Sequence, residues 1–227
     1  MAQPRLRALA TDYDGTIAHH GTVPPNTLQA LQRLKSAGFR LILVTGRELN
    51  ELRAIFPELS WFDLAVVENG GVIFHPASEK IELLAGGPPV KFVEALKAAS
   101  IPVQVGHSIV ATWEPHEKKV LEIIHEQCLE LQVIFNKGAV MILPTGVNKA
   151  TGLKAACQQL GLEPAECAGV GDAENDHSFL DICGLSAAVA NALPVIKEKV
   201  HFVTQKDHGD GVIELIERML AAEEVRP

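Results

Sequence analysis

Short apolar runs recur in both outer parts of the chain, and segments with helical periodicity separate them. The runs at residues 6–11, 39–44, 64–67 and 168–170 consist almost wholly of Leu, Ile, Val, Phe and Ala. Strands that are apolar on both faces, with helices between them, are typical of a parallel sheet covered on both sides. The pattern therefore predicts an α/β fold with a Rossmann-like parallel sheet.

The helices of this part can be located by their periodicity and by their end signals. In the first one, Leu28, Leu31 and Leu34 recur on one face, with Asn26 expected as the N-cap and Gly38 as the end. Further helices are expected at residues 48–56, 148–160, 194–199 and 211–222, and further strands at 186–190 and 201–204.

The middle of the chain has a different order of elements. Expected helices at 89–99 and 117–129 each precede an expected hairpin, at 103–113 and at 133–143, the second turning at an Asn-Lys-Gly sequence. This αββαββ order predicts a small antiparallel sheet with two helices on one face. We expect a catalytic core formed by residues 1–78 and 148–227, with an α+β domain of residues 79–147 inserted after the third core strand.

Composition excludes several classes of function. The 227 residues carry a formal net charge of −8, which argues against a nucleic-acid partner, because such proteins neutralise phosphates with Lys and Arg. No apolar run reaches the roughly 18 residues that a membrane span needs. No two of the four cysteines have C-x-x-C spacing, so we expect buried, reduced thiols in a cytoplasmic protein, either monomer or homodimer.

Four polar clusters lie at the carboxyl ends of expected strands or at the start of a helix, the edge of a parallel sheet where ligands bind. Several carboxylates in one crevice repel each other unless a cation joins them, and oxygen ligands without His or Cys suit Mg²⁺. An Asp can act as a nucleophile, and a second acid can protonate a leaving oxygen. The clusters are Asp12 with Asp14, Thr45 with Gly46, Asn148 with Lys149, and Asp172 with Asn175 and Asp176.

Each cluster alone has an ordinary structural explanation. An Asp at a strand end is most often a turn residue or a helix cap, and a Lys at a helix start is usually solvated. The chemical interpretation depends on finding all four clusters together at equivalent positions.

The four clusters together resemble the motifs of the haloacid dehalogenase-like hydrolase superfamily. The resemblance is to its Cof-type branch, subfamily IIB, which carries a small C2-type cap and includes phosphoglycolate and sugar-phosphate phosphatases. The matching segments are residues 12–17 (DYDGTI), 44–47 (VTGR), 146–153 around Lys149, and 171–176 (GDAEND), with 68–71 (ENGG) also typical of the branch.

The resemblance implies a phosphatase that hydrolyses a small phosphomonoester through an aspartyl-phosphate intermediate. Asp12 would attack phosphorus and ligate Mg²⁺, and Asp14 would be the general acid and base, with its backbone carbonyl on the metal. Asp172 would ligate the metal directly, and Asp176 directly or through water.

The same resemblance implies a phosphate-binding set. Thr45 and Gly46 would hold the phosphoryl oxygens, Asn175 would contact the phosphate, and Lys149 would neutralise charge on the nucleophile and the phosphate. The inserted domain would act as the cap that selects the small phosphorylated metabolite.

Two alternatives stay open: a phosphosugar mutase of the same superfamily and a non-enzymatic module that senses a phosphorylated metabolite. The cap carries no readable motif. Some of the side chains near its hairpins could meet the substrate, although each is more commonly a turn residue, a packed aromatic or a solvated charge. These side chains are His107, Trp113, Glu114, Asn136 and Lys137. The pair His19 and His20 is expected to face solvent.

Overall fold

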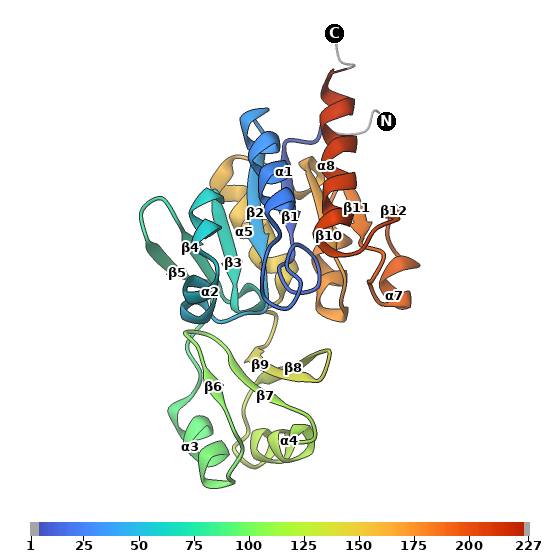
Figure 1. The fold of residues 1–227 in the computed structure, drawn as a ribbon. Coiled ribbons are helices and arrows are strands. Elements are labelled where there is room, and N and C mark those ends of the chain that lie inside the picture. Colours follow the sequence, from blue (N-terminus) through green and yellow to red (C-terminus); the bar gives the residue numbers. More distant parts are fainter. Residues whose placement is uncertain (1–4, 225–227) are drawn as a thin grey trace.

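The computed structural model describes residues 5–224 and contains two sheets (Figure 1). The larger sheet has eight strands in the order β12-β11-β10-β1-β2-β3-β4-β5, and those from β12 to β3 run parallel. The parallel strands are β1 (Ala8–Thr11), β2 (Arg40–Val44), β3 (Leu64–Val67), β10 (Cys167–Gly171), β11 (Leu185–Ala188) and β12 (Phe202–Val203). The predicted α/β fold with a parallel sheet is confirmed.

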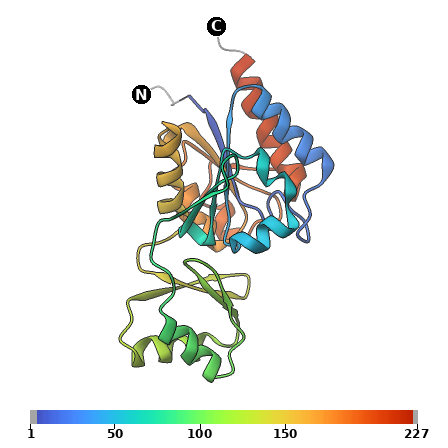
Figure 2. The same ribbon diagram turned by 90° about the vertical axis from the view of Figure 1, so that its left-hand side faces the viewer.

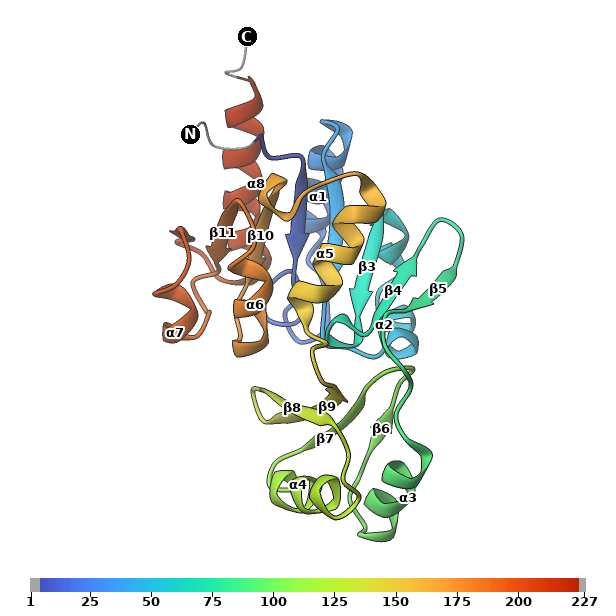
Figure 3. The ribbon, with the colours of Figure 1, turned by 180° about the vertical axis from the view of Figure 1, so that it is seen from behind.

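Helices cover both faces of the large sheet, as the apolar strands require. On one face α1 (Pro25–Ser36) lies beside α8 (His208–Glu224), and on the other α5 (Lys149–Leu160) packs against β3, as Figures 2 and 3 show. The shorter helices are α2 (Leu49–Ile55), α6 (His177–Leu180) and α7 (Pro194–Lys197). A single apolar cluster includes residues from both faces of the sheet.

The smaller sheet is antiparallel, in the order β6-β7-β9-β8. Its strands are β6 (Gln104–Val105), β7 (Val110–Trp113), β8 (Leu131–Asn136) and β9 (Ala139–Pro144). Helices α3 (Val90–Ala98) and α4 (Glu117–Glu126) lie on the face directed away from the large sheet (Figure 1). Phe92, Leu96 and Val120 belong to its separate core. The expected order of helices and hairpins in this segment is confirmed.

The small sheet enters the chain later than expected. Strands β4 (Val72–His75) and β5 (Lys80–Leu83) extend the large sheet by antiparallel pairing, so the insertion follows β5 and not β3. Residues 80–83, which the predicted boundary at residue 79 assigned to the insertion, therefore pair within the large sheet. β5 is an edge strand with charged Lys80 and Glu82, so it lacks the apolar signature of its neighbours.

Two local predictions are wrong. Asn26 does not cap α1. Pro25 occupies the first turn, and the side-chain Nδ2 of Asn26 donates to Asp210 Oδ1 at 2.7 Å. Gly38 does follow the helix end, with a φ of 90°. Cys157, Cys167 and Cys183 are buried free thiols as expected, but Cys128 is exposed. Within residues 5–224, no helix combines the length and apolar content that crossing a bilayer requires.

Candidate active site

The structure brings the four polar clusters together at the carboxyl edge of the large sheet. Asp12 follows β1, Thr45 follows β2, Asp172 follows β10, and Lys149 begins α5. Ligand oxygens of Asp12, Asp172 and Asp176 lie within 4.8 Å of one another. Sheet register produces this convergence, because β1 pairs with both β2 and β10.

Lys149 is at the centre of the cluster. Its ammonium donates to Asp12 Oδ1 and to Asp176 Oδ1, each at 2.6 Å, and the side chain is buried. Asn148 sets the position of Lys149 by capping α5. The Thr151 backbone N–H donates to Asn148 Oδ1, and the Asn148 backbone N–H donates to Thr151 Oγ1, both at 3.0 Å. Burial alone would lower the pKa of Lys149, but the charges of the two carboxylates outweigh it and raise the pKa.

The three buried carboxylates carry more charge than Lys149 neutralises. Burial raises the pKa of Asp12 well above its usual range, and Asp176 raises it further. Burial and Asp176 likewise raise the pKa of Asp172, against the opposing effect of Lys137. A cluster of buried oxygen donors with excess negative charge fits a hard divalent cation such as Mg²⁺.

The local structure that places Asp176 in the cluster differs from the helical turn that its spacing from Asp172 predicted. The interval of four residues suggested one helical turn, but Asp172 directly follows β10 and Asp176 lies in a 3₁₀ turn. Asp176 Oδ2 accepts the backbone N–H groups of Asp172 at 2.8 Å and Ala173 at 2.9 Å, while Oδ1 binds Lys149. Both oxygens of Asp176 are therefore engaged in holding the loop and the lysine.

Asp14 lies at the side of the cluster, and Arg47 binds it at two points. Arg47 Nε donates to one Asp14 oxygen at 2.6 Å and Nη2 to the other at 2.7 Å, while Nη1 binds Glu51. Arg47 belongs to the VTGR segment, but no role was predicted for it. The position of Arg47 two residues after Thr45 is the feature of the sequence that could have placed it at the site.

Asn69, for which no role was predicted from the sequence, lies beside the residues that are expected to bind phosphate: Thr45, Gly46 and Asn175. Asn175 Nδ2 donates to Asn69 Oδ1 at 3.0 Å, which leaves Asn175 Oδ1 and Asn69 Nδ2 buried without a hydrogen-bond partner among residues 5–224. A Cβ at Gly46 would lie 3.2 Å from Met141 Sδ, so the backbone is closely approached there. The buried Asn69 Nδ2 is an available donor for an anion. The position of Asn69 in the ENGG segment is the feature of the sequence that could have predicted this role.

A cavity of about 220 Å³ lies between the two sheets and is lined by part of this edge, although Lys149, Asp172 and Asp176 do not line it. Its core residues include Asp12, Asp14 and Thr45, and the small sheet contributes Thr112, Trp113, Asn136 and Met141, among others. Its volume is below the roughly 300–1,000 Å³ of typical ligand pockets, which indicates a small ligand.

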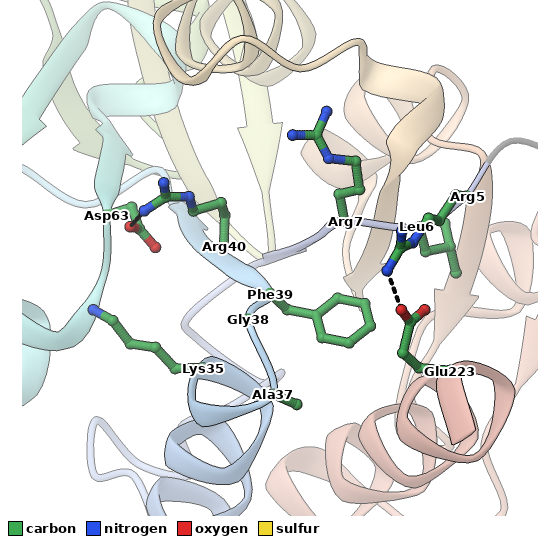
Figure 4. Close-up of a pocket in the computed structure, with 10 residues that line it drawn as sticks. All are labelled: Arg5, Leu6, Arg7, Lys35, Ala37, Gly38, Phe39, Arg40, Asp63 and Glu223. Atoms are coloured by element: carbon green, nitrogen blue, oxygen red, sulfur yellow. Dashed lines mark hydrogen bonds and ion pairs between the residues drawn. The ribbon is translucent and has the colours of Figure 1, made fainter. Parts of the chain in front are cut away.

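A larger cavity of about 500 Å³ lies at the opposite edge of the large sheet, around Phe39 (Figure 4). Its arginines are paired with acids: Arg5 with Glu223, Arg7 with Glu166, and Arg40 with Asp63. It contains none of the predicted site residues.

Other candidate side chains divide between the site and the surface. Lys137, at the turn between β8 and β9, forms an ion pair with Asp172, and His107 Nδ1 lies 3.2 Å from Glu68 Oε1. Glu114 does not line the cavity. His19 and His20 are exposed as expected; His19 packs edge-on against His208.

Comparisons with known proteins show to which family the chain belongs. The family model described as haloacid dehalogenase-like hydrolase matches residues 9–100 and 103–216. A phosphoglycolate phosphatase of Haloarcula marismortui is 30% identical over 221 residues, covering 92% of this chain and 95% of the relative. That of Methanothermobacter thermautotrophicus is 27% identical over 223 residues, covering 95% and 99%.

Solved structures share the fold. A haloacid dehalogenase-like hydrolase from Bacteroides thetaiotaomicron superposes with a TM-score of 0.80 at 19% identity, covering 95% of this chain and all of that one. A subclass IIB sugar phosphatase gives 0.75 at 19% identity, covering 93% and 98%. The resemblance inferred from the motifs is confirmed, and the chain belongs to the haloacid dehalogenase-like hydrolase family.

Proposed function

We propose that this protein is a Mg²⁺-dependent phosphatase that hydrolyses a small phosphomonoester, with Asp12 as the nucleophile. The observation that carries the proposal is the buried Lys149 ammonium, which binds both Asp12 and Asp176 beside Asp172. The names of the curated relatives, phosphoglycolate phosphatases, support the same class of reaction.

The first half-reaction transfers the phosphoryl group to the enzyme. Asp12 attacks phosphorus, and the Lys149 contact to its Oδ1 holds the carboxylate in place for the attack. The phosphorus–oxygen bond to the leaving group breaks as the new bond to Asp12 forms, and a protonated Asp14 gives its proton to the leaving oxygen. Asp14 lines the same cavity, and one of its two contacts with Arg47 must open for it to carry this proton.

The second half-reaction returns the enzyme to its starting state. Asp14, now ionised, takes a proton from a water molecule, which attacks phosphorus and displaces the Asp12 carboxylate. Phosphate leaves, and Asp14 keeps the proton for the next cycle. Thr45, Gly46, Asn175 and Lys149 bind the phosphoryl oxygens, and this preorganised set of donors stabilises the transition state.

The metal would be held by Asp12, Asp172 and the Asp14 backbone carbonyl, and it would take the place of the Lys137 ammonium that pairs with Asp172 in this structure. Asp176 would act through water, since Lys149 and two backbone N–H groups engage its oxygens. Bound Mg²⁺ would supply positive charge for the phosphoryl oxygens and for the excess of buried carboxylate.

The proposal is tested by phosphate release from a panel of phosphorylated metabolites that includes phosphoglycolate and sugar phosphates. We expect release with Mg²⁺ and none after chelation. Recovery of an isomerised sugar phosphate in place of free phosphate would instead indicate a mutase, and binding without turnover would indicate a sensing module.

Metal binding should also appear in stability. Mg²⁺ at about 100 times its dissociation constant should stabilise the folded protein by about 2.7 kcal/mol. Thermal unfolding with and without Mg²⁺ measures this, and Asp172→Asn should remove most of the shift. An equal shift in wild type and variant would contradict the assignment of Asp172 as a ligand.

A further inference from the structure

A buried carboxylate outside the catalytic set joins the two sheets. Glu68 follows β3, and its side chain is fully buried. Its Oε1 accepts the His107 amide at 3.1 Å, and its Oε2 accepts the amides of Ser108 at 2.7 Å and Ile109 at 3.2 Å. Successive backbone N–H groups around one carboxylate form an anion-binding nest, here filled by a side chain of the same protein.

The turn approaches Glu68 so closely that only glycine fits at two positions. A Cβ at Gly106 would lie 2.7 Å from the Glu68 carboxyl carbon, and a Cβ at Gly71 would lie 2.5 Å from Ser108 Oγ. The backbone at Glu68 is also unusual, with a φ of 52° in the left-handed region that favours glycine. A residue kept in this conformation indicates a demand on its side chain.

Residues 68–70 also contact the catalytic loops. The Glu68 amide donates to the Arg47 carbonyl at 2.9 Å, and the Asn69 amide donates to the Thr45 carbonyl at 3.0 Å. A Cβ at Gly70 would lie 2.0 Å from the Asn148 carbonyl oxygen, directly before Lys149. This segment therefore contacts the phosphate-binding loop, the start of α5 and the small sheet.

We propose that Glu68 is a positioning residue that holds the small sheet over the catalytic edge. The turn it binds joins β6 to β7, and these strands place Gln104, Thr112 and Trp113 in the wall of the cavity. The kinetic part of this inference rests on the proposed phosphatase function. Glu48 and His107 lie near Glu68, but three amides and the His107 ring already engage its oxygens, so the cluster needs no cation.

Two variants weaken the contact from opposite sides. Glu68→Gln removes the charge, and Gly106→Ala inserts a methyl group against the carboxylate while leaving every core residue unchanged. Gly86→Ala is the matched control, because a Cβ there would meet nothing within 4 Å. Glu82→Gln, in edge strand β5, is the control for loss of a carboxylate.

We expect amide hydrogen exchange at residues 107–109 to become at least about tenfold faster in both test variants, because charge-assisted hydrogen bonds are the stronger class. With the best phosphomonoester of the panel, KM should rise about tenfold or more and kcat should change by less than about threefold, since the catalytic set stays in place. Both controls should match wild type.

Unchanged exchange at 107–109 in both test variants would overturn the inference, as would a loss of kcat at constant KM. If Glu68→Gln does not fold, the hydrogen exchange and the kinetic constants of Gly106→Ala decide the test. Hydrogen exchange needs no substrate, so failure of the positioning role and failure of the phosphatase proposal give different results.

Discussion

Asp12→Asn is expected to reduce phosphate release by at least about 10,000-fold, a loss comparable to those seen when other enzymes lose their nucleophile. The amide cannot form the bond to phosphorus that the carboxylate forms. Steady-state phosphate release with Mg²⁺ measures the loss, and residual turnover above one thousandth of wild type would contradict the role of Asp12.

The same substitution should leave the metal-free fold intact. The pKa of Asp12 is raised in the folded protein, chiefly by burial, so its ionised form opposes folding as the pH rises above the ordinary pKa of Asp. At neutral pH, metal-free Asp12→Asn should therefore unfold at or above the wild-type temperature. A much lower unfolding temperature would show that lost activity reflects lost structure.

Lys149→Met is expected to lower the free energy of unfolding by about 3–5 kcal/mol, because it leaves Asp12 and Asp176 buried without their shared cation. Denaturant titration of the metal-free protein measures this. Lys154→Met is the matched control: Lys154 is exposed on the same helix, and surface changes usually stay within about 0.5 kcal/mol.

A double variant separates charge from packing. Adding Asp176→Asn to Lys149→Met removes one of the two uncompensated carboxylates, so part of the lost stability should return. If the double variant is no more stable than Lys149→Met, the lysine stabilises the protein by packing and not by charge. Phosphate release should fall in both variants, because Lys149 also binds the phosphoryl group in the proposed reaction.

The features that sequence analysis predicted well share a local origin. Strands β1, β2 and β10 are recognisable in the sequence as apolar runs, and a polar residue of the site follows each of them: Asp12, Thr45 and Asp172. The turn at Lys137 and Gly138 was also predicted from its Asn-Lys-Gly sequence. Both residues adopt the positive φ that tight hairpins require. Strand β5 was missed because an exposed edge strand with Lys80 and Glu82 needs no continuous apolar run. Strand β4 was missed although Val72, Ile73 and Phe74 form a buried apolar run.

The features that sequence analysis missed depend on partners distant in the chain. Arg47 binds Asp14 from 33 residues away, and Glu68 accepts amides from a turn about 40 residues later. The contact of Asp176 Oδ2 with the Asp172 backbone N–H depends on a 3₁₀ turn, and the four-residue spacing does not distinguish such a turn from an α-helix.

The most direct test of the central claim is detection of phosphate covalently bound to Asp12. Asp14→Asn should slow attack by water while p-nitrophenyl phosphate, which needs no acid to expel its leaving group, still phosphorylates the enzyme. After mixing with Mg²⁺ and acid quenching, peptide mass spectrometry should place phosphate on Asp12, and Asp12→Asn should show none. Release of p-nitrophenol with no phosphorylated Asp12, or with phosphate on another residue, would contradict the account.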